Sequence, residues 1–494
     1  MSKFYSLQAV LTVCLFLTLC GFGSNTTAYA DSPKQAKNVI LFIGDGMGFN
    51  SDVAGTLWRY GEEDAQSYHK FPVKLGAATF CVHKHSNGVV EWNGETDKGY
   101  VPEEFWKGPD GAQYRHTNTE TTDSGASATA INTGYKTRGG RINYSMKDER
   151  LRNFADMNYE AGRSVGVLST NQISHATPAG ASAHNVNRGA YEEISKEQIN
   201  DLPLTVLMGC GHPCYDNGKK IEKDANDLNY QFVGGREVWE KVSANDGYKG
   251  WSFIDSKEDF ARLADETPDK GAKLPKKLLG VVRSNGDMAP VDGGNDEFNE
   301  KRFTKAQLEN IPTLAQMTLG ALNVLAQNDK GFYLMVEGGS IDHANHGNNV
   351  ANMVLEHTGF TKAIDAAVDW VEKYSSWDET IMIITADHET GQIWGAGTYD
   401  DNDDNGKFKA KDDTFNELMP IEQSDADDVP DVQYLTTGHS NSLVPVYVKG
   451  VGSESASQFI RGNDEKAGEF WSFSGDFIYN SDVFNIMSAA SGLK

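Results

Sequence analysis

The sequence predicts an α/β fold: a three-layer sandwich with a central, mostly parallel sheet and added polar insertions. Five short apolar, β-branched runs are bounded by glycine or polar turns, as expected of strands covered on both faces. They occupy residues 38–43, 164–169, 331–336, 380–385 and 443–448. Helical patterns lie between strands, and this alternation is typical of α/β proteins. No internal repeat is visible.

Two helices are predicted from local signals. Apolar residues recur at helical spacing from Phe360 to Val371, which predicts a helix with one buried face. Thr177-Pro178 suggests a helix start, with a hydroxyl cap and proline in the first turn. Arg188 then lies at or just past the end of that helix, two to three turns from its start. Only a long side chain folding back would reach the start.

The first thirty residues are predicted to be a signal peptide. Lys3 precedes an apolar run too short to span a membrane, and Ala28-Tyr29-Ala30 is a small-x-small cleavage site. We therefore expect one catalytic domain over residues 31–494, a periplasmic or secreted location, and no stable membrane association.

The formal net charge of −25 argues against nucleic acid as a partner. Binding to nucleic acids or anionic membranes requires basic patches. A small anionic substrate is not excluded, because local cations decide its binding.

Three cysteines follow the predicted cleavage site. In an oxidising compartment, Cys210 and Cys214 in "CGHPC" are expected to form a local disulfide, which leaves Cys81 free. The alternatives are two free thiols or a metal site that includes His212.

Two long polar segments, near residues 190–310 and 397–431, are interpreted as insertions on the body of the domain. The second is rich in aspartate. It is a candidate calcium site, although such runs are more often solvated surface.

Acids and histidines follow four of the predicted strands. The carboxyl ends of parallel strands meet at one edge of the sheet, where ligands bind. His439 precedes the last strand and is within reach of the same edge. Each motif alone is more often a turn, a cap or a surface pair. The candidates, in chain order, are Asp45, His175, Thr177, Glu337, Asp342, His343, His346, Asp387 and His388.

Together these side chains predict metal binding. Imidazole nitrogen with carboxylate oxygen suits zinc, and an all-oxygen set with a hydroxyl suits magnesium. There are more donors than one ion needs, so two or three ions are predicted.

A reactive serine is predicted at Ser124, in "TDSGASATA". It stands at the start of a helix of small residues, where the helix dipole and free N–H groups favour negative charge. A neighbouring metal would favour loss of its proton. The alternative is a small-residue helix packed against the sheet, which the nearby acid and histidine motifs make less favourable.

Six motifs resemble those of alkaline phosphatases, in the same order along the chain. They are "NVILFIGDGMG", "TDSGASATA", "HATPAGASAHNVNR", "VEGGSIDHANH", "TADHETGQI" and "GHSNSLVPVYVKG". The resemblance implies an alkaline-phosphatase-like fold and hydrolysis of phosphate monoesters through a phosphoserine. It also implies broad leaving-group specificity, an alkaline optimum, phosphate scavenging and a homodimer.

The resemblance also implies roles for individual residues. Ser124 would be the nucleophile, and Arg188, oriented by Asp123, would bind phosphoryl oxygens. One zinc would be held by Asp342, His346 and His439, and a second zinc by Asp45, Asp387 and His388. A magnesium would be held by Asp45, Thr177 and Glu337.

Two positions beside these metals vary within the family, and here both are histidines, His175 and His343. A neutral imidazole attracts magnesium less strongly than a carboxylate does, so zinc or cobalt can compete for the third site. His343 is expected to contact phosphate through water.

Three other functions are less favoured. A sulfatase needs a proline and an arginine after its nucleophile, which "DSGASAT" lacks. A phosphodiesterase usually has a different nucleophile environment and no arginine like Arg188. A non-catalytic metal or phosphate binder would lose Ser124, which is present here with its flanking residues.

Overall fold

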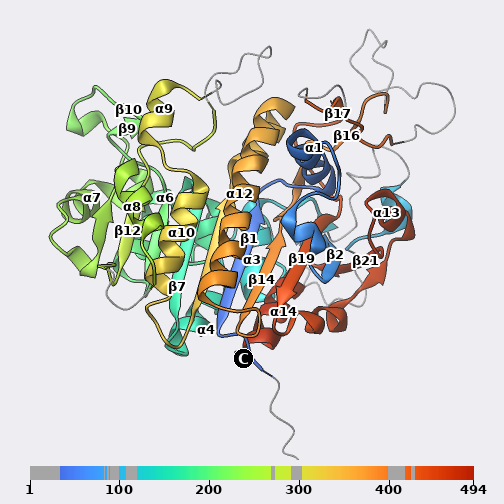
Figure 1. Cartoon of the computed structure of the whole chain (residues 1–494), viewed down its shortest axis with the longest axis horizontal. Helices are drawn as coiled ribbons and strands as arrows, with labels where there is room; N and C mark the ends of the chain where they lie inside the picture. Colours follow the sequence, from blue (N-terminus) through green and yellow to red (C-terminus); the bar gives the residue numbers. More distant parts are fainter. Residues whose placement is uncertain are drawn as a thin grey trace, which may run out of the picture. The chain divides into compact units, whose positions relative to one another are not determined.

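An eleven-stranded sheet forms the centre of the protein (Figure 1). Seven neighbouring strands run parallel, from β11 through β14, and β19 is antiparallel to both of its neighbours. In sheet order the strands are β11 (Ser252–Ile254), β12 (Leu278–Val281), β8 (Val206–Cys210), β7 (Ser164–Gln172), β13 (Phe332–Gly338), β1 (Asn38–Gly44), β14 (Thr380–Thr385), β19 (Val444–Gly450), β2 (Val73–Ala78), β21 (Asp476–Tyr479) and β20 (Gly462–Asn463). The predicted α/β class with a mostly parallel sheet is confirmed.

The computed structural model describes residues 34–82, 84–85, 88–89, 99–106, 119–268, 273–290, 303–398, 418–423 and 429–494. The predicted signal peptide and most of the acidic segment 397–431 lie outside these residues. From Gln35 onward the chain forms one compact unit. No helix among the described residues is both long and apolar enough to span a bilayer.

All five predicted strands are present, as β1, β7, β13, β14 and β19. The strands β1, β13 and β14 are buried along their whole length, which explains their continuous apolar runs. Three further strands, β8, β12 and β11, lie within residues 190–310 and extend one end of the sheet. With five, four and three residues, they are too short to stand out in a polar segment.

Helices cover both faces of the sheet. In Figure 1 the helices α10 and α12 lie in front of the sheet and α3 lies behind it. The helix α12 packs against α1, α10 and α11, whereas α3 packs against α5 and α14. The helices are α1 (Phe49–Tyr60), α2 (Pro102–Phe105), α3 (Ser124–Thr133), α4 (Phe154–Glu160), α5 (Ala176–Gly180), α6 (Tyr191–Asn200), α7 (Gly235–Ser243), α8 (Lys257–Asp265), α9 (Lys305–Asn310), α10 (Leu314–Leu325), α11 (Ser340–His346), α12 (Val350–Tyr374), α13 (Glu465–Phe470) and α14 (Ser481–Ser491).

The predicted helix at Thr177-Pro178 is shorter than expected. Helix α5 has five residues, begins at Ala176 with His175 as its N-cap residue, and ends at Gly180. Thr177 is therefore inside the first turn and is not the cap. Because the helix ends early, Arg188 lies on a loop that returns to the start of the helix. The Arg188 side chain therefore does not have to fold back over two to three helical turns.

The expected disulfide is not formed: Cys81, Cys210 and Cys214 are free thiols. The Cys210 thiol lies at the end of β8, 3.3 Å from the Thr170 carbonyl oxygen. His212 lies 3.2 Å from an Asp255 carboxylate oxygen and belongs to none of the metal-ligand groups among the described residues.

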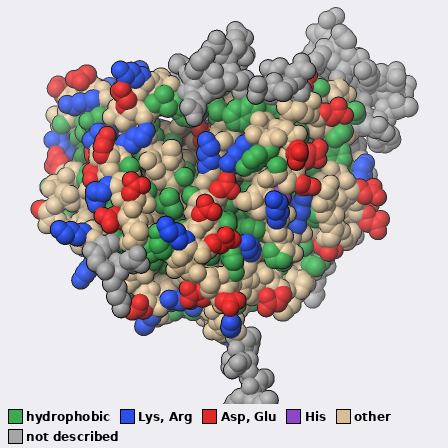
Figure 2. Space-filling model, in the orientation of Figure 1, with side chains coloured by type: hydrophobic (Ala, Val, Ile, Leu, Met, Phe, Trp, Pro, Cys, Tyr) green, Lys and Arg blue, Asp and Glu red, His purple; other side chains and the backbone are tan. Residues whose placement is uncertain are grey.

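The charged side chains on one face of the protein are of both signs. On the face drawn in Figure 2, acidic and basic side chains are interspersed over the helices that cover the sheet. The net charge is therefore not gathered into a single patch on this face.

A buried carboxylate ties α1 to α12 and β19. Asp52 is 2% exposed and accepts four hydrogen bonds. The donors are the hydroxyls of Tyr68 (2.5 Å) and Tyr447 (3.1 Å) and the Nε2 atoms of His69 (2.9 Å) and His357 (3.0 Å). Burial alone would raise the pKa of Asp52, but the two histidines hold that pKa well below its ordinary value.

We expect Asp52→Asn to lower the free energy of unfolding by about 3–5 kcal/mol, since an amide cannot satisfy four buried donors. The depressed pKa means that this stability is present above about pH 4 and is lost as the pH falls further. Urea unfolding of the metal-loaded protein at pH 7 measures the first effect, and unfolding of both proteins from about pH 4 down to about pH 2 measures the second. The control is Asp369→Asn, an exposed position on α12. A loss equal to that of the control would contradict the role of Asp52.

Candidate active site and metal centre

The loops that follow β1, β7, β13 and β14 meet at one edge of the sheet. The Asp45 N–H donates to the Gly338 carbonyl at 3.1 Å, and the Gly46 N–H donates to Asp387 Oδ1 at 3.1 Å. Gly46 has a φ of 71°, and a Cβ there would lie 2.7 Å from the Cα of Asp342. Only glycine allows both this turn and this approach.

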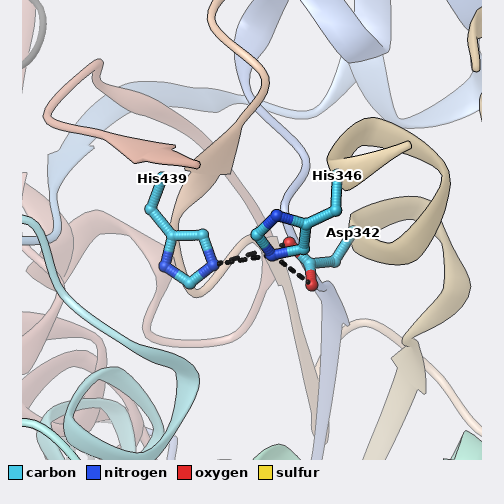
Figure 3. A group of neighbouring side chains, drawn as sticks. All are labelled: Asp342, His346 and His439. Carbon is cyan, nitrogen blue, oxygen red and sulfur yellow. Dashed lines mark hydrogen bonds and ion pairs between the residues drawn. The ribbon is translucent and has the colours of Figure 1, made fainter. Parts of the chain in front are cut away.

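Asp342, His346 and His439 form the first group of possible metal ligands. Figure 3 shows the two imidazoles pointing toward each other, with the Asp342 carboxylate beside His346. The Nε2 atoms of the histidines are 3.2 Å apart, and that of His346 is 3.3 Å from Asp342 Oδ2. Their Nδ1 atoms face the carbonyl oxygens of Thr437 and Thr122, which fixes Nε2 toward the group.

Asp45, Asp387 and His388 form the second group, and all three side chains are fully buried. His388 Nε2 lies 3.1 Å from Asp387 Oδ2 and 3.6 Å from Asp45 Oδ1. The imidazole of His388 stacks on that of His439 with ring centres 3.6 Å apart, so the first two groups adjoin.

The third group joins Asp45 to His175 and Glu337. Asp45 thus belongs to two groups and bridges them. Thr177, which the sequence places here, is buried with its hydroxyl unpaired among the described residues. His175, predicted only as a neighbour of the metals, offers a nitrogen within 4.8 Å of a carboxylate oxygen of both Asp45 and Glu337.

Several buried carboxylates of the site lie close together, and their combined negative charge favours bound cations. Burial, and then the charges of Asp387, Asp342 and Glu337, raise the pKa of Asp45 well above its ordinary value. Burial raises the pKa of both Asp387 and Glu337 to about 7. Among the described residues, five buried oxygens here lack a hydrogen-bond partner: Asp45 Oδ1 and Oδ2, Asp387 Oδ2, Glu337 Oε1 and Thr177 Oγ1. Since such atoms are normally satisfied, the set fits metal binding.

The histidines of the site differ in pKa because their surroundings differ. Burial lowers the pKa of His388 well below its ordinary value and that of His175 to about 3, so both rings are neutral. A hydrogen bond with Asp342 raises the pKa of His346 to about 9. Burial would raise the pKa of Asp342, but the surrounding histidines hold it far below its ordinary value. In the absence of metal, a proton on His346 balances the Asp342 charge.

Ser124 lies beside the second group. It is the first residue of α3 and is 2% exposed, and its Oγ lies 3.2 Å from His388 Nε2. Asp123 is the N-cap residue of α3 and accepts from the Ala126 N–H at 3.1 Å. The hydroxyl therefore lies both at a helix N-terminus and next to a possible metal ligand.

Arg188 reaches the same space from its loop. Its Nη1 donates to Asp123 Oδ2 at 2.9 Å, and its Nη2 lies 3.5 Å from His175 Nε2. Burial would raise the pKa of Asp123, but Arg188 holds it below its ordinary value, so the pair is ionised.

Three supporting residues were not predicted. The Thr390 hydroxyl donates to Asp342 Oδ1 at 2.6 Å, and the Ser169 hydroxyl donates to Glu337. Asp287 Oδ2 lies 2.7 Å from Nδ1 of His343. Asp287 follows strand β12 as the other acids follow theirs, so the same signal would have found it had that strand been predicted.

Comparison with known proteins identifies the family of this chain. A family model for alkaline phosphatase matches residues 107–467. The alkaline phosphatase of Escherichia coli is 30% identical over 394 residues, covering 74% of this chain and 73% of that protein. Alkaline phosphatase 4 of Bacillus subtilis is 27% identical over 395 residues, covering 78% and 68%.

Solved structures show the same fold. The alkaline phosphatase of Thermus thermophilus superposes with a TM-score of 0.59 at 20% identity, over 96% of each chain. That of the Antarctic bacterium TAB5 superposes with a TM-score of 0.56 at 20% identity, over 94% of this chain and all of that one.

The fold, the family match and the three ligand groups define a metal-binding hydrolase of the α/β class. More particularly, the chain belongs to the alkaline phosphatase family.

Proposed function

We propose that this protein hydrolyses phosphate monoesters through a phosphoserine at Ser124. The observation that carries the proposal is the position of the Ser124 hydroxyl, 3.2 Å from His388 Nε2 and at the N-terminus of α3. Family membership supports the reaction, and the buried unpaired carboxylate oxygens support a role for metals in it.

The residues of this chain have distinct tasks. Arg188, held by Asp123, binds two phosphoryl oxygens, and its charge opposes the charge that develops in the transition state. The Ser124 oxygen forms a bond to phosphorus as the bond to the ester oxygen breaks, and water later cleaves the phosphoserine. When bound, the metal ions supply positive charge and lower the pKa of the oxygen acids that they contact.

Two zinc ions and one magnesium ion fit the three ligand groups. The first two groups combine imidazole nitrogen with carboxylate oxygen, which zinc favours. The third has Asp45, Glu337 and the Thr177 hydroxyl, which suit magnesium, but it also has His175, which suits zinc or cobalt.

Recognition is directed at the phosphate rather than at the leaving group, so we propose broad specificity. Family membership supports an alkaline optimum. We also propose that the protein is exported to the periplasm or secreted, releases phosphate for scavenging, and forms a homodimer. N-terminal sequencing of exported protein and light scattering would test cleavage after Ala30 and the oligomeric state.

Removal of metal should abolish activity. Dialysis against EDTA is expected to lower the turnover of an aryl phosphate by at least about 10²-fold, and zinc with magnesium should restore it. Zinc alone should restore part of the activity, because the third group would then hold the less suitable ion. Dialysis against EDTA already saturated with zinc is the control. Full turnover by the metal-free protein would contradict the proposal.

A further inference from the structure

A row of polar side chains lines one side of the site and has a carboxylate at each end. At one end Asp123 Oδ2 accepts from Arg188 Nη1 at 2.9 Å. Arg188 Nη2 lies 3.5 Å from His175 Nε2. The ring centres of His175 and His343 are 6.0 Å apart. At the other end His343 Nδ1 lies 2.7 Å from Asp287 Oδ2.

The two terminal carboxylates are anchored in similar ways. Asp123 accepts backbone N–H groups from Ala126 and Gly140. Asp287 accepts the Ala289 N–H at 3.1 Å with Oδ1, which leaves Oδ2 for His343. Its loop is fixed to β7, because the next N–H, of Met288, donates to the Thr170 carbonyl at 3.1 Å. Backbone N–H groups therefore hold each carboxylate in place independently of its side-chain partner.

The contact with Asp287 decides which nitrogen of His343 faces the site. A carboxylate only accepts, so Nδ1 of His343 carries the hydrogen of this bond. The other nitrogen, Nε2, lies across the ring and has no hydrogen-bond partner among the described residues. The centre of the His343 ring lies 6.0 Å from that of His175, which belongs to the third ligand group.

We propose that Asp287 is a positioning residue: it fixes the His343 imidazole through Nδ1, so that Nε2 contacts the bound phosphate, as Asp123 fixes Arg188 at the opposite end of the row. The inference rests on the proposed function, because it takes phosphate as the ligand of this space. Its specific content is that Asp287 acts only through His343.

Binding of inorganic phosphate to the zinc- and magnesium-loaded protein tests this by calorimetry, without turnover. Asp287→Ala and His343→Ala are each expected to weaken binding about tenfold. The double variant should bind no more weakly than His343→Ala alone, since Asp287 then has nothing to position. Asp287→Asn keeps an acceptor for Nδ1 and should retain most of the affinity.

Asp255→Ala is the matched control, because Asp255 pairs with His212 in the same part of the chain and is as exposed as Asp287, 27% against 26%. It should leave phosphate binding unchanged, and metal content should be unchanged in every variant. The inference is overturned if Asp287→Ala binds like the unsubstituted protein, if the two single losses multiply in the double variant, or if the unsubstituted protein does not bind phosphate. Should Asp287→Ala not fold, Asp287→Ser, whose side chain is too short to reach Nδ1 of His343, replaces it in the same comparison with and without His343→Ala. Turnover by the unsubstituted protein tests the proposed function separately.

Discussion

Replacing Ser124 with alanine is expected to lower kcat for a phosphate monoester by at least about 10⁴-fold. The substitution removes the only hydroxyl that lies both at the N-terminus of α3 and within 3.2 Å of a possible metal ligand among the described residues. The histidine and carboxylate donors of all three ligand groups remain in this variant, and the second zinc loses only the Ser124 oxygen. Zinc and magnesium content should therefore remain normal while turnover is lost.

Labelled phosphate provides a second measurement of the same substitution. Denaturing the protein in acid during turnover should leave label on the peptide that contains Ser124, and none on the Ser124→Ala protein. Ser243→Ala is the control, since that hydroxyl donates to the Trp239 carbonyl within α7 and not toward the site. Normal hydrolysis by Ser124→Ala, or label on a different peptide, would show that another group attacks the ester.

Asp45→Asn is expected to have the second large effect, because Asp45 belongs to two ligand groups at once. An amide offers one oxygen and no charge, so both the second and the third group should bind metal weakly. We expect the purified variant to lose about two of its three ions and its kcat to fall at least about 10³-fold. Elemental analysis with activity at saturating zinc and magnesium measures both.

The same substitution should have the opposite effect on stability without metal. Asp45 lies among Asp387, Asp342 and Glu337, whose charges oppose its ionisation. Removing one carboxylate relieves this repulsion, so metal-free Asp45→Asn should unfold at a temperature equal to or above that of the metal-free unsubstituted protein. Asp482→Asn is the control: Asp482 is buried and paired with Arg461 away from the site, so that variant should lose stability and keep its metals. If metal-free Asp45→Asn unfolds at a lower temperature than the metal-free unsubstituted protein, repulsion among these carboxylates does not destabilise the metal-free state.

The strands that carry the site were predictable because burial on both faces requires continuous apolar runs. β1, β13 and β14 are fully buried; Asp45 directly follows β1, Glu337 is the last residue but one of β13, and Asp387 lies two residues after β14. The positions of Ser124 and Asp123 at the start of α3 were predictable from the helix of small residues and its acidic cap.

Other features depend on contacts between distant segments, which periodicity does not report. The early end of α5 at Gly180 brings Arg188 back to Asp123, and no local signal distinguishes this turn from a longer helix. Strand β12 is four residues long, so neither it nor Asp287 beyond it was predicted. The spacing of Cys210 and Cys214 suggested a disulfide, but the Cys210 thiol is directed to the Thr170 carbonyl.

The most direct measurement is anomalous X-ray diffraction at the zinc edge from crystals of the metal-loaded protein. Two strong peaks are expected, one between Asp342, His346 and His439, and one between Asp45, Asp387 and His388. The second peak should lie about 2 Å from the oxygen of Ser124. Zinc bound elsewhere, or a Ser124 oxygen about 10 Å from either peak and so beyond any coordination distance, would contradict the proposed site.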